Sequence, residues 1–422
     1  MTDFTGVPWP ELHEQSLVVD LHAHLSFPAA LFGFRLFRRH RPGLPTLSPL
    51  SVRTDFPKLE RGGVDVVLSS VNVPEIPLIE YAPGGKLWRF MAELLQPKVF
   101  RPPYCQASVN MMETVEQQTG RYKGGRPVRI ARSVQELKAA LAQGPPKPIT
   151  LIHTLEGAHA LLGDEGGKGT YPQLAADSPV AREMLTHLQE FYDRGVALIT
   201  VAHFFPNGVA AGCYPFPEPF LPGIRWRKAL REHDLTLGLT EAGEMIIQRM
   251  LELGILIDVT HCTPAARARI YQLAEGCQRP AVVATHVGAY TINPSPYNLQ
   301  DWEIKWIAEH GGVVGVIFMN YWLGAHHQTK LGIHYVVRTL EHFIQAAGTE
   351  GVAAFGSDFD GFTDPPDDLA DAAELPWLTQ HLLALYQDSG KRRFGDGAIK
   401  GILGGNALRV LQEGWGKQWA VT

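Results

Sequence analysis

The chain has 422 residues, and its 38 basic and 43 acidic side chains give a net charge of −5 with histidine counted as neutral. Hydrophobic residues make up 45% of the chain and charged residues 19%, which is typical of a packed globular protein and excludes a disordered or fibrous one. The slightly acidic balance gives no electrostatic footprint for nucleic acid, so we expect small-molecule partners.

The cysteines and the first residues bear on the compartment. The four cysteines are too few for a disulfide scaffold and are expected to be reduced: Cys105, Cys213, Cys262 and Cys277. Residues 1–16 contain three acidic side chains and no apolar run, so no signal peptide is visible. No apolar run approaches the ~18 residues of a membrane span. These features predict a cytoplasmic protein.

Eight short segments rich in Val, Ile and Leu recur along the chain. They lie at residues 17–20, 64–71, 149–155, 197–202, 255–259, 281–284, 313–318 and 352–355. Continuous apolar runs of this length are typical of parallel strands that are buried on both faces.

Helical stretches separate the later segments. One is capped by Thr240 and runs to about Leu253, where Gly254 ends it. Others are predicted at residues 264–274, 299–309 and 335–346. Repeated strand–helix units without a hairpin signal predict an α/β fold with a parallel sheet. Eight such units predict a (β/α)8 barrel of TIM type, formed by one domain over residues 1–422.

Three longer segments interrupt this rhythm, at residues 26–61, 74–148 and 204–235. Each follows a predicted strand and is rich in Pro, Gly or aromatic residues. Loops after the strands of a (β/α)8 barrel rise from its C-terminal face, where catalytic sites are built. We therefore expect these three insertions to shape a pocket.

Side chains that bind metals stand at the ends of five predicted strands. Residues 20–24 read Asp-Leu-His-Ala-His after the first strand, Glu156 follows the third, His261 the fifth, His286 the sixth and Asp358 the eighth. One His-x-His pair is weak evidence on its own. Five matches at strand ends that converge on one cavity predict a common site.

Two divalent metal ions would be held by a set of this kind: His22, His24, Glu156, His261, His286 and Asp358. Two ions can share a hydroxide if a carboxylate bridges them, and Glu156 is the natural bridge. His22 and His24 can reach one ion, and His261 and His286 the other. Asp358 either ligates or passes the proton of the attacking water to the leaving amine.

These stretches resemble the membrane (renal) dipeptidase family of zinc metallopeptidases, within the amidohydrolase-like barrels. The resemblance is carried by residues 238–261, by Ala284-Thr285-His286, by residues 311–316 and 356–361, and by Gly404-Gly405-Asn406. Order and spacing fit from about residue 149 to residue 411, and before that only residues 20–24 match well.

The resemblance implies a role for each matching residue. The metal ligands of the family fall on His22, Glu156, His261 and His286, with Glu156 bridging two zinc ions, and the catalytic aspartate falls on Asp358. The histidine that steadies the tetrahedral intermediate falls on His203. A preorganised donor suits that role, because charge develops on the former carbonyl oxygen.

Two positions depart from the family. Where the family has an aspartate ligand this chain has His24, so the site is one unit more positive, and we expect an altered metal preference. Where the family has an arginine that clamps the substrate carboxylate, this chain reads Tyr297-Asn298. A tyrosine offers one hydrogen bond and no charge. Arg225 or Arg227 is an alternative clamp.

We therefore expect a dinuclear zinc hydrolase that cleaves a dipeptide or N-acyl amino acid by attack of a metal-bridging hydroxide. His203, Tyr297 and Asn298 are expected to contact the substrate. One alternative is a related metal hydrolase of a lactone, cyclic amide or ester, and another is a barrel that binds a ligand without catalysis. Homodimerisation stays open.

Overall fold

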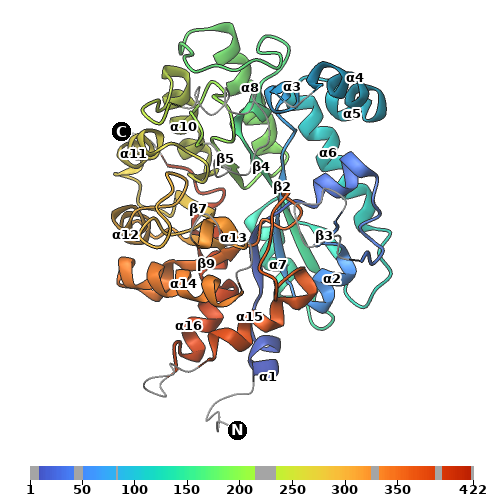
Figure 1. Cartoon of the computed structure of the whole chain (residues 1–422), viewed down its shortest axis with the longest axis vertical. Helices are drawn as coiled ribbons and strands as arrows, with labels where there is room; N and C mark the ends of the chain where they lie inside the picture. Colours follow the sequence, from blue (N-terminus) through green and yellow to red (C-terminus); the bar gives the residue numbers. More distant parts are fainter. Residues whose placement is uncertain are drawn as a thin grey trace.

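A nearly closed barrel of eight parallel strands forms the centre of the protein (Figure 1). The computed structural model describes residues 9–41, 51–81, 84–213, 234–324, 332–384 and 392–419. The strands follow one another in chain order: β1 (Val19–Ala23), β2 (Val66–Val71), β4 (Ile149–Glu156), β5 (Leu198–Thr200), β6 (Leu256–Asp258), β7 (Val282–Val287), β8 (Val314–Ile317) and β9 (Ala353–Gly356). The predicted (β/α)8 architecture is confirmed, and each predicted strand overlaps an observed one.

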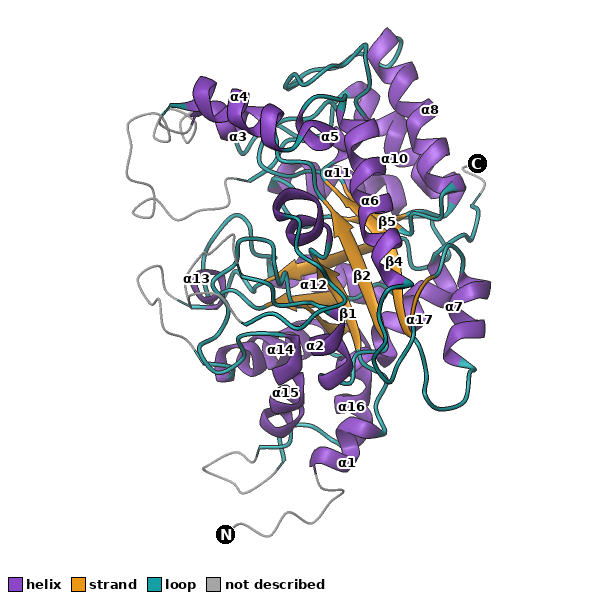
Figure 2. Ribbon diagram, turned by 90° about the vertical axis from the view of Figure 1, so that its right-hand side faces the viewer, coloured by secondary structure: helices purple, strands orange, loops and turns teal. Residues whose placement is uncertain are grey.

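Every residue of these eight strands is buried. Helices cover the outside of the barrel, as Figure 2 shows for the strands at the centre of the molecule, and the inward side chains fill its interior. Burial on both faces explains why the strands read as continuous apolar runs rather than as alternating patterns.

The barrel closes between β1 and the residues that follow β9. The backbone N–H of Asp358 donates to the carbonyl of His22 at 2.9 Å, and that of His24 donates to the carbonyl of Phe359 at 2.9 Å. The buried Asp20 carboxylate accepts from the backbone N–H of Ser357 at 2.9 Å and from its hydroxyl at 2.5 Å. This seam thus joins the first and last strands next to the predicted site residues.

The predicted helices are confirmed to within two residues at each end: α10 (Glu241–Leu253), α11 (Pro264–Ala274), α12 (Asp301–Glu309) and α14 (His334–Ala347). The Thr240 hydroxyl caps α10 by accepting from the backbone N–H of Gly243, and Gly254 ends that helix at φ 82°. The helix α12 begins two residues later than predicted because Gln300 and Glu303 form a capping box.

The segments predicted as insertions carry further elements. Residues 26–61 contain η1 (Phe27–Leu31) and α2 (Phe56–Arg61), and residues 74–148 contain α3 (Ile76–Tyr81), α4 (Gly85–Leu95), α5 (Pro97–Phe100), α6 (Tyr104–Thr119), β3 (Val128–Ile130) and α7 (Val134–Leu141). The sequence did not predict β3, which pairs with the first residues of β4. Of residues 204–235, the structure describes 204–213 and 234–235.

The remaining helices complete the described chain. They are α1 (Trp9–Glu14), η2 (Ala158–Leu161), α8 (Pro179–Asp193), α13 (Asn320–Leu323), η4 (Glu350–Val352), η5 (Ala372–Glu374), α15 (Leu375–Leu382), α16 (Asp396–Lys400), η6 (Gly401–Gly405) and α17 (Asn406–Gly414). Within the described ranges, no helix has both the length and the apolar character that a membrane crossing requires. All four cysteines are free thiols.

Candidate metal centre and substrate pocket

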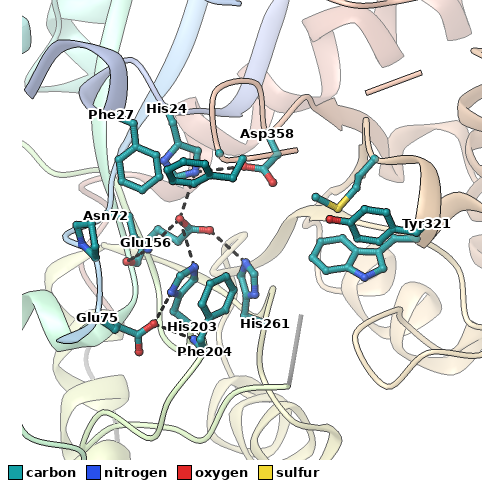
Figure 3. Close-up of a pocket in the computed structure, with 15 residues that line it drawn as sticks. His24, Phe27, Asn72, Glu75, Glu156, His203, Phe204, His261, Tyr321 and Asp358 are labelled. Atoms are coloured by element: carbon teal, nitrogen blue, oxygen red, sulfur yellow. Dashed lines mark hydrogen bonds and ion pairs between the residues drawn. The ribbon is translucent and has the colours of Figure 1, made fainter. Parts of the chain in front are cut away.

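The predicted strand-end side chains meet around Glu156, at the C-terminal end of β4 (Figure 3). One carboxylate oxygen, Oε1, lies 3.1 Å from His261 Nε2, 3.4 Å from His286 Nε2 and 3.5 Å from His22 Nε2. The other oxygen, Oε2, lies 3.2 Å from His24 Nε2. His24 Nε2 is also 3.2 Å from Asp358 Oδ1. All of these side chains are buried.

The donor set fits divalent cations. The Nε2 atoms of His22 and His24 are 3.1 Å apart, and those of His261 and His286 are 3.2 Å apart. Ligand nitrogens in a tetrahedral zinc site lie about 3.3–3.4 Å apart, because Zn–N bonds measure about 2.0–2.1 Å. The ligand atoms of His22, His24 and Glu156 lie within 4.8 Å of one another, as do those of Glu156, His203 and His261. Imidazole nitrogens with a shared carboxylate suit zinc.

The Glu156 carboxylate sets the charge of the cluster. Burial opposes the charged form of His24, but Glu156 and Asp358 outweigh it and raise the pKa of that imidazole to about 10, so a cation bound there would displace a hydrogen from the ring. Burial opposes ionisation of Glu156, but the neighbouring His24, His203 and His22 outweigh it and hold the pKa of its carboxyl well below its usual range. Burial lowers the pKa of His261 to about 4 against the opposing effect of Glu156. At neutral pH, His261 is therefore a neutral imidazole with a lone pair, which is the form that binds a metal.

Two of these residues have an unusual backbone conformation that directs their side chains toward the site. His261 has φ 67° and Asp358 has φ 52°, in the left-handed region that non-glycine residues rarely adopt. The surrounding backbone holds both: the N–H of Cys213 donates to the His261 carbonyl at 2.7 Å, and the N–H of Gly361 donates to the Asp358 carbonyl at 3.1 Å. Such conformations cost about 1–3 kcal/mol each and cluster at functional sites.

Hydrogen bonds behind the cluster fix the imidazole of His286. Asp258 Oδ2 accepts from the Thr285 hydroxyl at 2.6 Å, so the hydroxyl oxygen, 2.7 Å from His286 Nδ1, is left to accept from that nitrogen. The hydrogen of the neutral ring is thereby placed on Nδ1. The lone pair on Nε2 then faces the cluster, as a metal ligand requires.

Two residues near the cluster were not predicted from the sequence. Asn72, one residue after β2, donates from Nδ2 to Glu156 Oε2 at 3.1 Å. Glu75 accepts from His203 Nδ1 at 2.6 Å. Burial opposes ionisation of Glu75, but His203 outweighs it and lowers the pKa of the carboxyl. The sequence signal that could have found them is their position soon after the C-terminal end of a predicted strand, where the other site residues also lie.

A pocket opens over the cluster and has largely aromatic walls. Beside His24 lie Phe27 and Phe362, and Phe27 stacks on the His24 ring at a centroid distance of 4.7 Å. Phe204, which stacks on His203, and Met319, Tyr321 and Trp322 also line the pocket. Figure 3 shows Phe27 and Tyr321 on different sides of the Glu156 cluster. The pocket also reaches Asn72, Glu75, Glu156, His203, His261 and Asp358.

The structure does not bring Tyr297 and Asn298 to this pocket wall. The Tyr297 hydroxyl donates to the backbone carbonyl of His286 at 2.7 Å, and its ring stacks on Trp322 at a centroid distance of 3.6 Å. The amide of Asn298 is used within the protein, where its oxygen accepts from the N–H of Gly288 and its nitrogen donates to two carbonyls. Both residues therefore support the site from behind. Arg225 and Arg227 lie outside the described residues.

The fold and this cluster define a metallohydrolase barrel. The model of the membrane dipeptidase family, peptidase family M19, matches residues 9–416. The chain belongs to this family of metallo-dipeptidases.

Solved structures with the same fold span nearly the whole chain. The metallopeptidase of Rhodobacter sphaeroides, solved with a phosphinate mimic of the dipeptide L-Ala-D-Ala, is 21% identical at a TM-score of 0.68, over 95% of this chain and 100% of that one. The probable dipeptidase PvdM of Pseudomonas aeruginosa is 17% identical at a TM-score of 0.69, over 96% and 97%. An uncharacterized protein in the pqqA 5′ region of Klebsiella pneumoniae is 35% identical over 234 residues, which are 54% of this chain and 76% of that protein.

Proposed function

We propose that this protein hydrolyses the amide bond of dipeptides or similar small amides at a centre of two divalent metal ions, most readily zinc. The observation that carries this proposal is the convergence of four histidine Nε2 atoms on the two oxygens of one buried carboxylate, Glu156. In this assignment His22 and His24 would hold one ion, His261 and His286 would hold the other, and Glu156 would contribute to both.

Bound ions would polarise the amide carbonyl and acidify the attacking water. Asp358 then takes the proton of that water and delivers it to the leaving nitrogen, a role that suits a carboxylate 3.2 Å from His24 at the pocket floor. His203, with Nε2 3.9 Å from Glu156 Oε2, donates from Nε2 to the carbonyl oxygen as charge develops there, in the doubly protonated form whose other hydrogen, on Nδ1, is bonded to Glu75. The aromatic walls exclude competing water.

The proposed catalytic domain spans residues 1–422, and its three insertions each supply part of the pocket. Phe27 comes from the first, Glu75 from the second and Phe204 from the third. We propose a reducing compartment such as the cytoplasm for this domain, in keeping with its free thiols.

The test combines metal analysis with a substrate panel of L,L and L,D dipeptides, an N-acyl amino acid and a lactone. About two zinc ions per chain with dipeptide cleavage support the proposal. His261→Ala and Glu156→Ala should each abolish metal loading and turnover, whereas the exposed His334→Ala should change neither. Full activity of His261→Ala would refute the assignment.

A second candidate substrate is a lactone, cyclic amide or ester without a free carboxylate. It is favoured by the pocket wall, because none of the lining residues that the structure describes is Lys or Arg. A matched pair distinguishes the two candidates: a dipeptide and the same dipeptide with its carboxylate amidated. Faster cleavage of the amidated form would select the uncharged substrate.

A further inference from the structure

Glu75 accepts three hydrogen bonds from the segment that carries His203. It lies in the loop between β2 and α3 and is 3% exposed. Its Oε2 accepts from His203 Nδ1 at 2.6 Å and from the backbone N–H of Phe204 at 3.1 Å, and its Oε1 accepts from the backbone N–H of Phe205 at 3.0 Å. Figure 3 shows this carboxylate beside the imidazole, on the side away from Glu156.

The pairing fixes which ring nitrogen faces the pocket. Two of the three groups on Glu75 are backbone N–H donors, so the carboxylate acts here as an acceptor, and His203 Nδ1 carries the hydrogen of the third bond. A bond of 2.6 Å from one edge of the ring leaves Nε2 directed toward Glu156 Oε2, 3.9 Å away. Orientation of a functional imidazole through its other nitrogen is a common use of a buried carboxylate.

Hydrogen bonds to β4, η2 and α6 hold the loop that carries Glu75 in place. Asn72 donates to the Glu156 backbone carbonyl at 3.2 Å, His159 Nε2 lies 2.9 Å from the Val73 carbonyl, and the backbone N–H of Ile76 donates to the Tyr104 hydroxyl at 2.9 Å. These contacts lie on both sides of Glu75 in the chain. The carboxylate therefore acts from a fixed support, which precise positioning of a functional group requires.

We propose that Glu75 is the positioning residue for His203 and holds its Nε2 toward the carbonyl oxygen of the substrate. Glu75 acts through His203 rather than on the reacting atoms. The inference rests on the proposed function for the role of His203, whereas the Glu75–His203 pairing stands on the geometry alone.

The test is a double-mutant cycle of Glu75→Gln and His203→Ala, measured on a substrate that the wild type cleaves. Glu75→Gln should lower kcat by about 10- to 100-fold, with little change in KM or in metal content. Tm should fall by about 1–3 °C, because the glutamine NH2 leaves one buried backbone N–H without an acceptor. The same substitution made in the His203→Ala protein should cause no further loss of kcat, because its effect passes through that ring. Loss of kcat by equal factors in both backgrounds would overturn the proposal.

The matched control is Glu183→Gln. Glu183 likewise accepts three hydrogen bonds, but all three come from backbone N–H groups, those of Gly163, Glu165 and Gly166, so its substitution should leave kcat unchanged. A rise in KM confined to substrates with a free amino group would overturn the proposal in another way, because Glu75 would then bind the substrate ammonium.

A spectroscopic readout separates this inference from the proposed function. The short bond to Glu75 should give the His203 Nδ1 hydrogen a downfield proton resonance that is lost in Glu75→Gln and in His203→Ala and retained in Glu183→Gln. If the wild type cleaves no member of the panel, the proposed function fails while this resonance still tests the pairing. Absence of the resonance in the wild type would overturn the pairing itself.

Discussion

Replacing Asp258 by asparagine should weaken metal binding without touching a proposed ligand. The Asp258 carboxylate is fully buried and accepts five hydrogen bonds. Oδ1 accepts from the backbone N–H and hydroxyl of Thr260 and from the backbone N–H of Thr285, and Oδ2 accepts from the hydroxyls of Thr200 and Thr285. An asparagine can keep the three bonds at Oδ1 but presents an NH2 group in place of Oδ2.

The amide NH2 donates, so both threonine hydroxyls must turn to accept from it. The Thr285 hydroxyl then donates to His286 Nδ1, 2.7 Å away, and the ring hydrogen moves to Nε2, where it blocks metal binding. Loss of such an orienting contact lowers metal affinity about 10- to 100-fold, which is about 1.4–2.8 kcal/mol. Folding stability should fall by about 2–5 kcal/mol, because all five charge-assisted bonds become neutral bonds that are each up to about 1 kcal/mol weaker, while the neutral amide costs less to bury than the carboxylate.

The assay is calorimetric titration of metal-free protein with zinc in the presence of a competing chelator, with urea unfolding of the metal-free form. Asp360→Asn is the control, because Asp360 also accepts backbone and hydroxyl donors, from Arg53 and Thr54, and none of its described hydrogen bonds reaches a histidine of the cluster. We expect weaker zinc binding in Asp258→Asn and near-normal binding in Asp360→Asn. Wild-type affinity in Asp258→Asn would refute the reasoning, as would an equal loss in both variants.

Three further outcomes follow from contacts elsewhere. Free metal at 100 times its Kd stabilises the folded protein by about 2.7 kcal/mol per site. With an unfolding entropy of about 0.9 kcal/mol/K for 422 residues, calorimetry should show Tm falling by about 3 °C per ion on chelation. An unchanged Tm would argue against bound ions. Tyr297→Phe should lower the free energy of unfolding by about 1–2 kcal/mol because the His286 carbonyl loses its donor, while KM stays constant; a raised KM would make Tyr297 a substrate contact. Arg267→Met leaves the buried Glu303 without its 2.6 Å ion pair. The free energy of unfolding, measured with urea, should fall by about 3–5 kcal/mol. A fall below about 1 kcal/mol would mean that Glu303 finds another partner.

The barrel and the Glu156 cluster were predictable because both leave a local trace in the sequence. A strand buried on both faces is a run of apolar residues, and the polar residue that ends the run stands at the C-terminal face. That rule alone located Glu156, His261 and His286. The same rule ended β7 too early, because Thr285 and His286 interrupt the apolar run, whereas the observed strand continues to Val287. The polar Thr285 is tolerated inside the barrel because its hydroxyl donates to Asp258.

The residues that the sequence did not reveal act through contacts that no local pattern specifies. Glu75 lies four residues beyond β2 and meets His203, which follows β5. Tyr297 was expected to contact substrate because it replaces an arginine of the family, but its hydroxyl reaches the His286 backbone instead. The strand β3 is only three residues long, too short for a periodic signal.

The barrel seam also determines when, during synthesis of the chain, the metal cluster can be completed. The backbone of His22 and His24 is held in place by Asp358 and Phe359, which lie beyond the last strand. On the ribosome, the N-terminal part of the metal cluster is therefore made long before its support exists. A nascent chain whose β9 has not yet emerged from the ribosome should bind metal weakly. Binding of the ions should therefore be one of the last events in the biosynthesis of this enzyme.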